Sequence, residues 1–437
     1  LVVGLGGTGA NTILYLKKIF MEQFGKIPVA MQFLSLDTDM GTKETSLSSP
    51  LLKENVEIND DEFIHLSIQN TLETIKASDS VREWWPEGIP ALSVRNGTGA
   101  VRALGRLAFY THSHDIMEVV KQKKLRWIDD LSLFKDLEGQ DFRLLDGKEI
   151  YVVGSLAGGT GSGTFLDAAF LMNHVVGDVT AGCGFFILPW IFEGLPATPR
   201  IEANAYAALK ELEYYMGLKY NETSIKRKYG RDLIEIKRPP FDIINLIDGR
   251  NELGGNIKEA GSAGVKILCE LTAKAIMATC GPMGKISDSI LDNIKTIVSS
   301  ETAANWGGKF PYYSSIGVST ILYPAEKHFR KLSHLLGLKI VENGINKYRH
   351  IKEIGKEDMI EKAVADDVSN FLAEARLREE GNDIINSLIP YGSSSTDFNI
   401  PSDLKKRKDI AQELKSLADA NRNRLNDDLR IRLTENM

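Results

Sequence analysis

The stretch Gly158-Gly159-Thr160-Gly161-Ser162-Gly163-Thr164 lies between an apolar run at 150–153 and a helix-like run at 165–171. A strand, a glycine-rich turn and a helix in this order bring backbone N–H groups and the positive end of a helix dipole together, which suits a phosphate group. The glycines let the backbone approach phosphate oxygens closely, and the hydroxyl groups add hydrogen-bond donors. The sequence nowhere contains the P-loop pattern G-x-x-x-x-G-K-[ST]. The stretch therefore predicts a phosphate-binding loop of another kind.

A second glycine loop opens the chain, within Leu1-Val2-Val3-Gly4-Leu5-Gly6-Gly7-Thr8-Gly9-Ala10-Asn11. It also has the order strand, turn and helix, and its glycines at 4, 6 and 9 match the dinucleotide-binding pattern G-x-G-x-x-G. Two such loops after two parallel strands can face one nucleotide from both sides. A dinucleotide site built on one loop does not require the second.

The two loops and three further segments resemble, in matching order, the nucleotide loops of the tubulin and FtsZ superfamily. The resemblance covers about the first 320 residues and is closest to divergent bacterial tubulin-like proteins. The matching segments are residues 4–11, similar to G-x-G-G-x-G-x-N; Asp37-Thr38-Asp39, similar to Asn-Thr-Asp; Gly97-Thr98-Gly99-Ala100 with Gly105-Arg106, similar to the third FtsZ loop; residues 158–163, similar to the signature G-G-G-T-G-[ST]-G; and residues 189–194, similar to P-F-x-F-E-G.

Three positions depart from the family pattern. Ala157 stands where the first signature glycine would be, a small change that still allows close approach to a phosphate. Asp37 replaces Asn, which keeps an acceptor for a ribose hydroxyl and adds a charge near the phosphates. Arg200 lies three residues further from the fifth segment than the family's arginine would, so the resemblance does not assign it a role.

The resemblance implies binding of GTP or GDP with Mg²⁺, and the choice of guanine rests on it alone. It also implies a contact to the base or ribose after the apolar run 241–248, for which Asp248 is the candidate and Asn251 the alternative. No metal site built from protein ligands is expected, since His112 and His114 have no companion cluster. The residues expected to contact the nucleotide are Gly6, Gly7, Thr8, Gly9, Asn11, Asp37, Thr38, Gly97, Gly99, Ala100, Ala157, Gly158, Gly159, Thr160, Gly161, Ser162, Glu193 and Asp248.

Asp288 and Asp292 are the candidate catalytic residues. They are four residues apart on one expected helix face, a spacing at which like charges are mildly unfavourable. The resemblance implies that such acids polarise water against the γ-phosphate held by the neighbouring subunit. An acid favoured by the dipole at a helix N-terminus is the competing interpretation, and Glu301 is the next candidate.

We therefore expect a GTPase that assembles head-to-tail into homo-oligomers or filaments. One alternative is a nucleotide-gated scaffold with little or no hydrolysis. Another is an NAD-dependent oxidoreductase, for which Asp37, 28 residues beyond Gly9, would be the ribose-binding acid. That alternative gives the loop at 158–163 no role, and no His, Lys or Tyr constellation suited to hydride transfer stands out.

Alternating strand-like and helix-like segments predict a doubly wound α/β fold with a mostly parallel sheet. We expect strands at 1–4, 32–36, 150–155, 184–188 and 241–248. The expected organisation is a nucleotide-binding domain at 1–257 with an insertion at about 43–95, a central helix at 258–280, the start of a reduced or remodelled second domain at 281–324 with a strand at 309–322, and a helical region at 325–437 that can offer a surface to other proteins.

The composition is that of an ordinary globular protein, with 43% hydrophobic and 26% charged residues among 437. A net charge of −6 argues against nucleic acid as a bulk electrostatic partner. No apolar stretch approaches the ~20 residues that a membrane-spanning helix requires. Three cysteines in apolar runs (Cys183, Cys269 and Cys280) are expected to be buried thiols in a reducing cytoplasm. The sequence begins without Met and only three residues precede Gly4, so we expect either a fragment or a chain whose ordered part begins here.

Overall fold

The computed structural model divides the chain into two compact units, Leu1–Ile321 and Leu322–Met437. All helices and strands named below belong to the first unit. Of the predicted helical region 325–437, the structure describes 331–335 and 337–338, which are helical. The described residues are 1–49, 51–90, 92–127, 147–194, 200–217, 224–230, 232–250, 256–257, 262–280, 313–318, 331–335 and 337–338.

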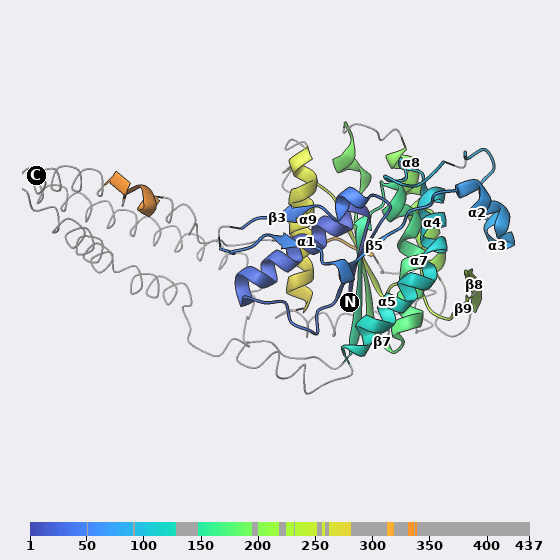
Figure 1. Ribbon diagram of the computed structural model, residues 1–437, viewed down its shortest axis with the longest axis horizontal. Helices are drawn as coiled ribbons and strands as arrows, with labels where there is room; N and C mark the ends of the chain where they lie inside the picture. The colour runs from blue at the N-terminus through green and yellow to red at the C-terminus, as the bar shows by residue number, and fades with distance from the viewer. Residues whose placement is uncertain are drawn as a thin grey trace, which may run out of the picture. The chain divides into compact units, whose positions relative to one another are not determined.

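A seven-stranded sheet, in the order β11-β10-β7-β6-β1-β2-β5, forms the centre of the first unit (Figure 1). All neighbouring strands are parallel. The strands are β1 (Val2–Leu5), β2 (Phe33–Asp37), β5 (Phe63–His65), β6 (Lys148–Ser155), β7 (Val179–Ile187), β10 (Ile243–Ile247) and β11 (Tyr313–Ser314). The chain runs outward from β1 through β2 to β5, then returns beside β1 as β6 and continues the other way. The carboxyl ends of β1 and β6 thus flank the point where the strand order reverses, which is where open α/β sheets bind ligands.

Helices cover both faces of the sheet, with α1 and α9 on one side and α4, α5 and α7 on the other (Figure 1). The long helices are α1 (Gly6–Phe24), α4 (Arg102–Thr111), α5 (Ser113–Leu125), α7 (Gly159–Val176), α8 (Ile201–Met216) and α9 (Ser262–Cys280). Shorter elements are the helices α2 (Thr71–Ala77) and α3 (Asp79–Arg82), the 3₁₀ turns η1 (Met40–Thr42), η2 (Asp60–Glu62) and η3 (Pro189–Phe192), and the hairpins β3 (Ser46–Leu47) with β4 (Val56–Glu57) and β8 (Ile225–Tyr229) with β9 (Asp232–Ile236).

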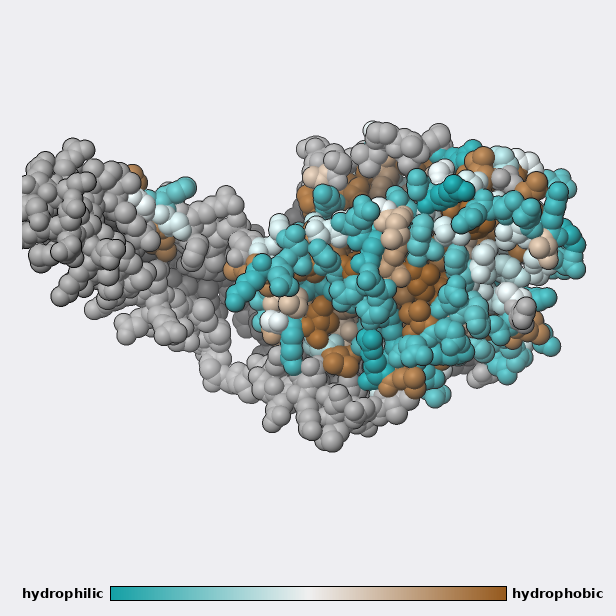
Figure 2. Space-filling model, in the orientation of Figure 1, coloured by the Kyte–Doolittle hydropathy of each residue, from teal (hydrophilic) through white to brown (hydrophobic). Residues whose placement is uncertain are grey.

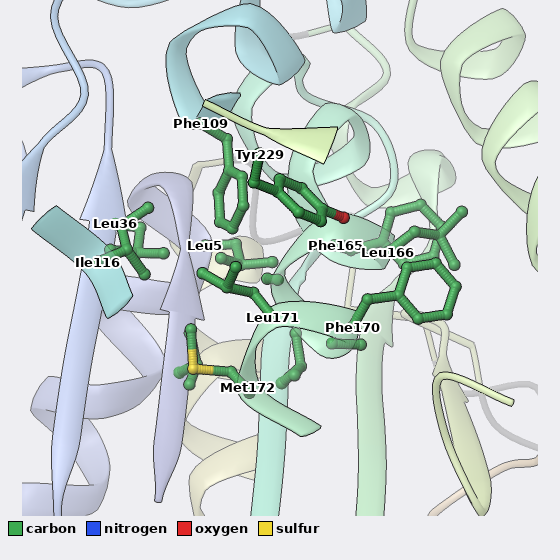
Figure 3. Packing of buried hydrophobic residues seen from close by; sticks show 14 of the residues in the cluster. Leu5, Leu36, Phe109, Ile116, Phe165, Leu166, Phe170, Leu171, Met172 and Tyr229 are labelled. Atoms are coloured by element: carbon green, nitrogen blue, oxygen red, sulfur yellow. The ribbon is translucent and has the colours of Figure 1, made fainter. Parts of the chain in front are cut away.

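The alternation of side chains along each strand divides the core between these two helical layers. On β1, Val2 belongs to the cluster shared with α1 and α9, whereas Val3 and Leu5 belong to the cluster shared with α4, α5 and α7. Figure 3 shows part of the second cluster, in which Phe165 of α7 lies near Tyr229 of the β8–β9 hairpin. Burying a side chain of this size contributes about 1.5–3 kcal/mol. Both faces of the sheet are therefore anchored to helices that begin at its carboxyl edge.

The structure confirms the doubly wound α/β fold with a parallel sheet, and it differs from the sequence-based boundaries at three places. The stretch expected as an insertion at 43–95 contains β5, which pairs with β2 at the edge of the main sheet. The strand expected within 309–322 as part of a second domain is instead β11, which pairs with β10 in the main sheet. The β8–β9 hairpin was not expected. Residues 258–261 lie outside the described residues, and the helix after them runs from Ser262 to Cys280.

On the face in Figure 2, hydrophilic residues cover most of the described area and hydrophobic residues form separate patches. Among the helices of the described residues, none is both long and apolar enough to cross a membrane. Cys183 and Cys269 are buried, as predicted.

Candidate functional site

The two glycine loops of the sequence meet at the switch point of the sheet. Gly6 follows β1 with φ +68°, and the Cβ of a larger residue there would lie 3.5 Å from both Gly161 N and Thr160 Cβ. Glycine accommodates this left-handed conformation without steric cost. The N-termini of α1 and α7 are therefore neighbours.

The end of β2 joins the same site. Thr38 is fully buried, and its Oγ1 lies 2.7 Å from Thr160 Oγ1, so one hydroxyl donates to the other. Asp37 accepts hydrogen bonds from Thr38 N (2.7 Å) and from Thr42 Oγ1 (2.6 Å). Burial raises the pKa of the Asp37 carboxyl above its ordinary value, and these hydrogen bonds only partly oppose the rise.

The loop from Gly97 to Ala100 approaches from the other side. Gly97 N donates to Thr38 O (3.0 Å), which ties this loop to the end of β2. Gly97, Gly99 and Ala100 all have positive φ angles, of 91°, 58° and 60°. Such a conformation costs about 1–3 kcal/mol in a residue other than glycine and persists only where its surroundings impose it. Ala100 is thus held in place by its neighbours.

Three helices begin here, and no side chain caps the N–H groups of their first turns. The residues at the N-caps of α1, α4 and α7 are Leu5, Val101 and Gly158, none of which has a side-chain acceptor. The first turns of these three helices also contain no acidic residue. First-turn N–H groups need an acceptor, and the helix dipole makes a helix N-terminus attractive to anions. The site is therefore suited to a phosphate-bearing ligand.

The glycines of the site have two different roles. At Gly159 an added Cβ would lie 2.2 Å from Thr98 Oγ1 and 2.7 Å from Val101 N, so this glycine lets α7 pack against the loop before α4. Gly9 similarly packs α1 against β1, since its Cβ would lie 2.6 Å from Gly4 C. At Gly158 an added Cβ would meet nothing within 4 Å. Gly158 therefore borders open space, where a ligand has room.

Asn204 on α8 connects two of these loops, and sequence reasoning missed it. Its Nδ2 donates to Ala100 O and to Ala157 O, both at 2.9 Å. Arg102 adds a second connection, because its Nε donates to Ser162 Oγ (2.8 Å). Neither residue lies in a motif of the sequence. Asn204 stands out only in the structure, where this polar side chain is buried.

The sequence profile of the family described as "Tubulin like" matches residues 1–342. The chain belongs to this tubulin-like family. It resembles several solved structures: CetZ2 from Haloferax volcanii as a GTPγS-bound protofilament (17% identity, TM-score 0.34, 70% of this chain and 61% of that one), CetZ from Methanosaeta thermophila strain DSM 6194 (13%, 0.35, 70% and 57%) and TubZ from Bacillus thuringiensis serovar israelensis as a GTPγS-form protofilament (12%, 0.34, 63% and 55%). The tubulin-like chain thus spans about three fifths of the length of these proteins. No curated protein matches it.

Most of the residues predicted to contact a nucleotide in this tubulin-like chain lie at the meeting point of the loops. The hydroxyl of Ser162 is already used within the protein, because Ser162 is fully buried and its hydroxyl donates to Asn204 O (3.3 Å). Asn11 lies in the second turn of α1, where its Nδ2 donates to Gly7 O (2.8 Å). Thr8 presents its carbonyl to Cys269 Sγ of α9 at 3.5 Å. The central helix therefore touches the first loop.

The two remaining nucleotide candidates follow β7 and β10 on the same sheet edge. Glu193 comes directly after η3 and is partly exposed. Asp248 comes directly after β10, accepts a hydrogen bond from Gly249 N (2.7 Å) and pairs with Arg250 (3.3 Å). Because parallel strands end at one edge, both acids lie on the ligand-binding side of the sheet.

The candidates Asn251, Asp288, Asp292 and Glu301 lie outside the described residues. Within the described part of the chain, no group of three or more His, Cys, Asp or Glu side chains could hold a metal ion.

Proposed function

We propose that this tubulin-like protein binds GTP with Mg²⁺ at the junction of the two glycine loops and assembles head-to-tail in the presence of the nucleotide. The observation that carries the proposal is the convergence of three helix N-termini without caps or acids at the switch point of the sheet. The related CetZ2 and TubZ structures are GTPγS-form protofilaments, which supports the choice of guanine nucleotide and of assembly.

The phosphates would be bound by main-chain N–H groups of residues 6–9 and 158–161, with the Thr38 and Thr160 hydroxyls beside them. The open space at Gly158 and the left-handed backbone at Gly97 and Gly99 leave room for a ligand between the loops. Mg²⁺ would neutralise phosphate charge close to Asp37.

Hydrolysis is the second part of the proposal. Asp288 and Asp292 of one subunit would polarise water at the nucleotide held by the next, so turnover would require contact between subunits. Contacts of this head-to-tail kind generate open filaments. A nucleotide-gated scaffold is the same assembly without the hydrolytic step.

The proposal is tested by measuring GTP turnover per subunit and sedimentable polymer across protein concentrations. We expect turnover per subunit to rise with concentration and polymer to require GTP. Asp288→Ala and Asp292→Ala should bind GTP normally, and at least one should hydrolyse it about 10²-fold more slowly, the scale for loss of a group that assists proton transfer.

A mixing experiment identifies where the acids act. Gly158→Val lacks a working pocket but keeps its acids, whereas Asp292→Ala keeps its pocket, so a mixture should recover turnover that neither protein shows alone. Val is tolerated at this position because Gly158 has an extended conformation (φ −77°, ψ 169°) and open space around it. Concentration-independent turnover by a monomer contradicts assembly-dependent hydrolysis, and GTP-dependent polymer without turnover identifies the scaffold.

A further inference from the structure

A cavity of about 580 Å³ lies between α4, α7, α8 and residues 84–90 with Leu92. Apart from Ala100, its lining includes none of the residues predicted to bind the nucleotide. The apolar part of the lining includes Trp84, Ile89, Phe165 and Leu166. Cavities of about 300–1,000 Å³ with mainly apolar walls and a few polar groups are typical of small-molecule sites.

The polar part of the lining has an excess of positive charge. Asp167 is buried and paired with Arg106 (Nε to Oδ2, 3.2 Å) and with Arg227, and it accepts a hydrogen bond from Tyr229 (2.7 Å). The arginines and this hydrogen bond hold the pKa of the Asp167 carboxyl below its ordinary value despite its burial. Asp167 therefore balances only part of the charge that surrounds it.

Two arginines of the lining keep donors for another group. Arg106 uses Nε for Asp167, and its guanidinium lies 4.2 Å from the centre of the Trp84 ring. Arg200 is exposed at the N-terminus of α8, and the described part of the chain gives its side chain no hydrogen bond or ion pair. Of the other two arginines in the lining, Arg227 is paired with Asp167, and Arg102 is paired with Glu211 (2.6 Å). Four arginines thus face two carboxylates around one cavity.

We propose that this cavity binds a small organic anion with a flat apolar body, at a site separate from the nucleotide. The anionic group would accept hydrogen bonds from Arg106 and Arg200, and the apolar body would lie against Trp84 and Phe165. Arginine is well suited to this task, because its fork binds carboxylates and related anions through two hydrogen bonds.

The site also adjoins the proposed nucleotide loops. Asn204 and Arg102 line the cavity, and the same side chains bond to Ala100, Ala157 and Ser162. An occupant of the cavity would therefore contact the two residues that hold these loops in place.

The test uses the full chain and 1-anilinonaphthalene-8-sulfonate, an aromatic sulfonate that fluoresces in apolar surroundings, as the anion. We expect saturable binding of one dye per chain, weakened about tenfold in Arg200→Ala by loss of a charged donor. Ala103→Phe places a large side chain in the cavity wall and should abolish the saturable component. Arg126→Ala, which removes a half-exposed arginine at the end of α5 that is not part of this lining, should bind the dye like the wild type.

Thermal unfolding of each variant shows whether the fold is retained, and Ala103→Leu replaces Ala103→Phe if the larger side chain prevents folding. Equal dye affinity in wild type, Arg200→Ala and the cavity-filling variant overturns the proposal. Competitive displacement of the dye by GTP also overturns it, because the cavity would then be part of the nucleotide site. Saturable binding that depends on Arg200 and is not competitively displaced by GTP supports it, whatever the outcome for GTP hydrolysis.

Discussion

The carboxyl group of Asp37 is buried, and burial disfavours its charged form. The side chain is 3% exposed, and its pKa is raised mainly by desolvation. A group whose pKa is higher in the folded than in the unfolded protein stabilises the fold fully only below the unfolded pKa, near 3.8. That contribution is lost as the pH rises through the folded pKa. At neutral pH the ionised carboxylate therefore destabilises the free protein.

Asp37→Asn should increase the free energy of unfolding of the nucleotide-free protein at pH 7, because it removes this charge. The variant keeps an acceptor for Thr38 N, and Thr42 Oγ1 can accept from the new amide instead of donating. Urea unfolding at pH 4 and pH 8 measures the effect, and the gain should be larger at pH 8. A gain that is equal at both pH values, or a loss at both, contradicts a raised Asp37 pKa.

Asn204→Ala should weaken GTP binding although Asn204 is not proposed to contact the nucleotide. Its side chain joins the loops at Ala100 and Ala157, which the substitution would release. Each carbonyl left without its partner costs about 1–3 kcal/mol where water cannot replace it. We expect GTP affinity to fall about tenfold, measured by titration calorimetry. Asn173→Ala is the matched control, because Asn173 Nδ2 also donates to a carbonyl, that of Pro240 (3.0 Å), at the far end of α7. Equal losses of GTP affinity in both variants would show that Asn204 acts through the stability of the fold and not through the position of the loops.

At the scale of elements, the structure depends on how closely helices approach the strands and one another. Gly159 and Gly105 let α7 and α4 touch, since a Cβ at Gly105 would lie 2.3 Å from Gly159 O. The sequence suggested that Gly159 makes room for phosphate oxygens. The structure shows that its missing side chain makes room for Thr98, and that Gly158 faces open space.

Gly158→Ala and Gly159→Ala should therefore behave differently. Gly159→Ala forces two packed segments apart and should lower the free energy of unfolding by about 1–3 kcal/mol without nucleotide. Gly158→Ala should leave that free energy nearly unchanged and weaken GTP binding, because its methyl group occupies the open side of the loop. Chemical denaturation and GTP titration of both variants separate the two effects. Normal GTP binding by Gly158→Ala would show that the ligand does not approach this loop.

The elements that the sequence predicted are those with long apolar patterns or glycine motifs. Strands β1, β2, β6 and β10 appear within three residues of their expected bounds, since buried parallel strands are continuous apolar runs. Strand β5, which it missed, has only three half-buried residues, and the two-residue β11 was expected in a second domain instead of the main sheet. Their pairing depends on neighbours that are distant in the sequence, and local pattern carries no signal for it.

The same limit applies to the site. Motifs identified the loops, which lie in sequence next to the strands that position them. Asn204 and Arg102 reach the site from α8 and α4, so their role follows from helix packing rather than from a motif.

At the scale of the whole molecule, family membership covers residues 1–342, and the carboxyl edge of the sheet collects every loop that the motifs identified. Helix α9 contacts this edge, since Cys269 Sγ donates to Thr8 O (3.5 Å). Burial raises the pKa of the Cys269 thiol to about 12, so it stays protonated. A nucleotide that moved the first loop would thus act directly on α9, the element that precedes the candidate acids.

One guanine nucleotide is proposed to bind between the β1 and β6 loops, and direct titration tests this most directly. GTP, ATP and NAD⁺ are titrated with Mg²⁺ into the wild-type chain and into Gly158→Val, with heat of binding as the readout. We predict one GTP per chain, weaker ATP binding, no NAD⁺ binding, and loss of GTP binding in the variant while its thermal unfolding stays unchanged. Tight NAD⁺ binding without GTP binding, or unchanged GTP affinity in Gly158→Val, would contradict the account.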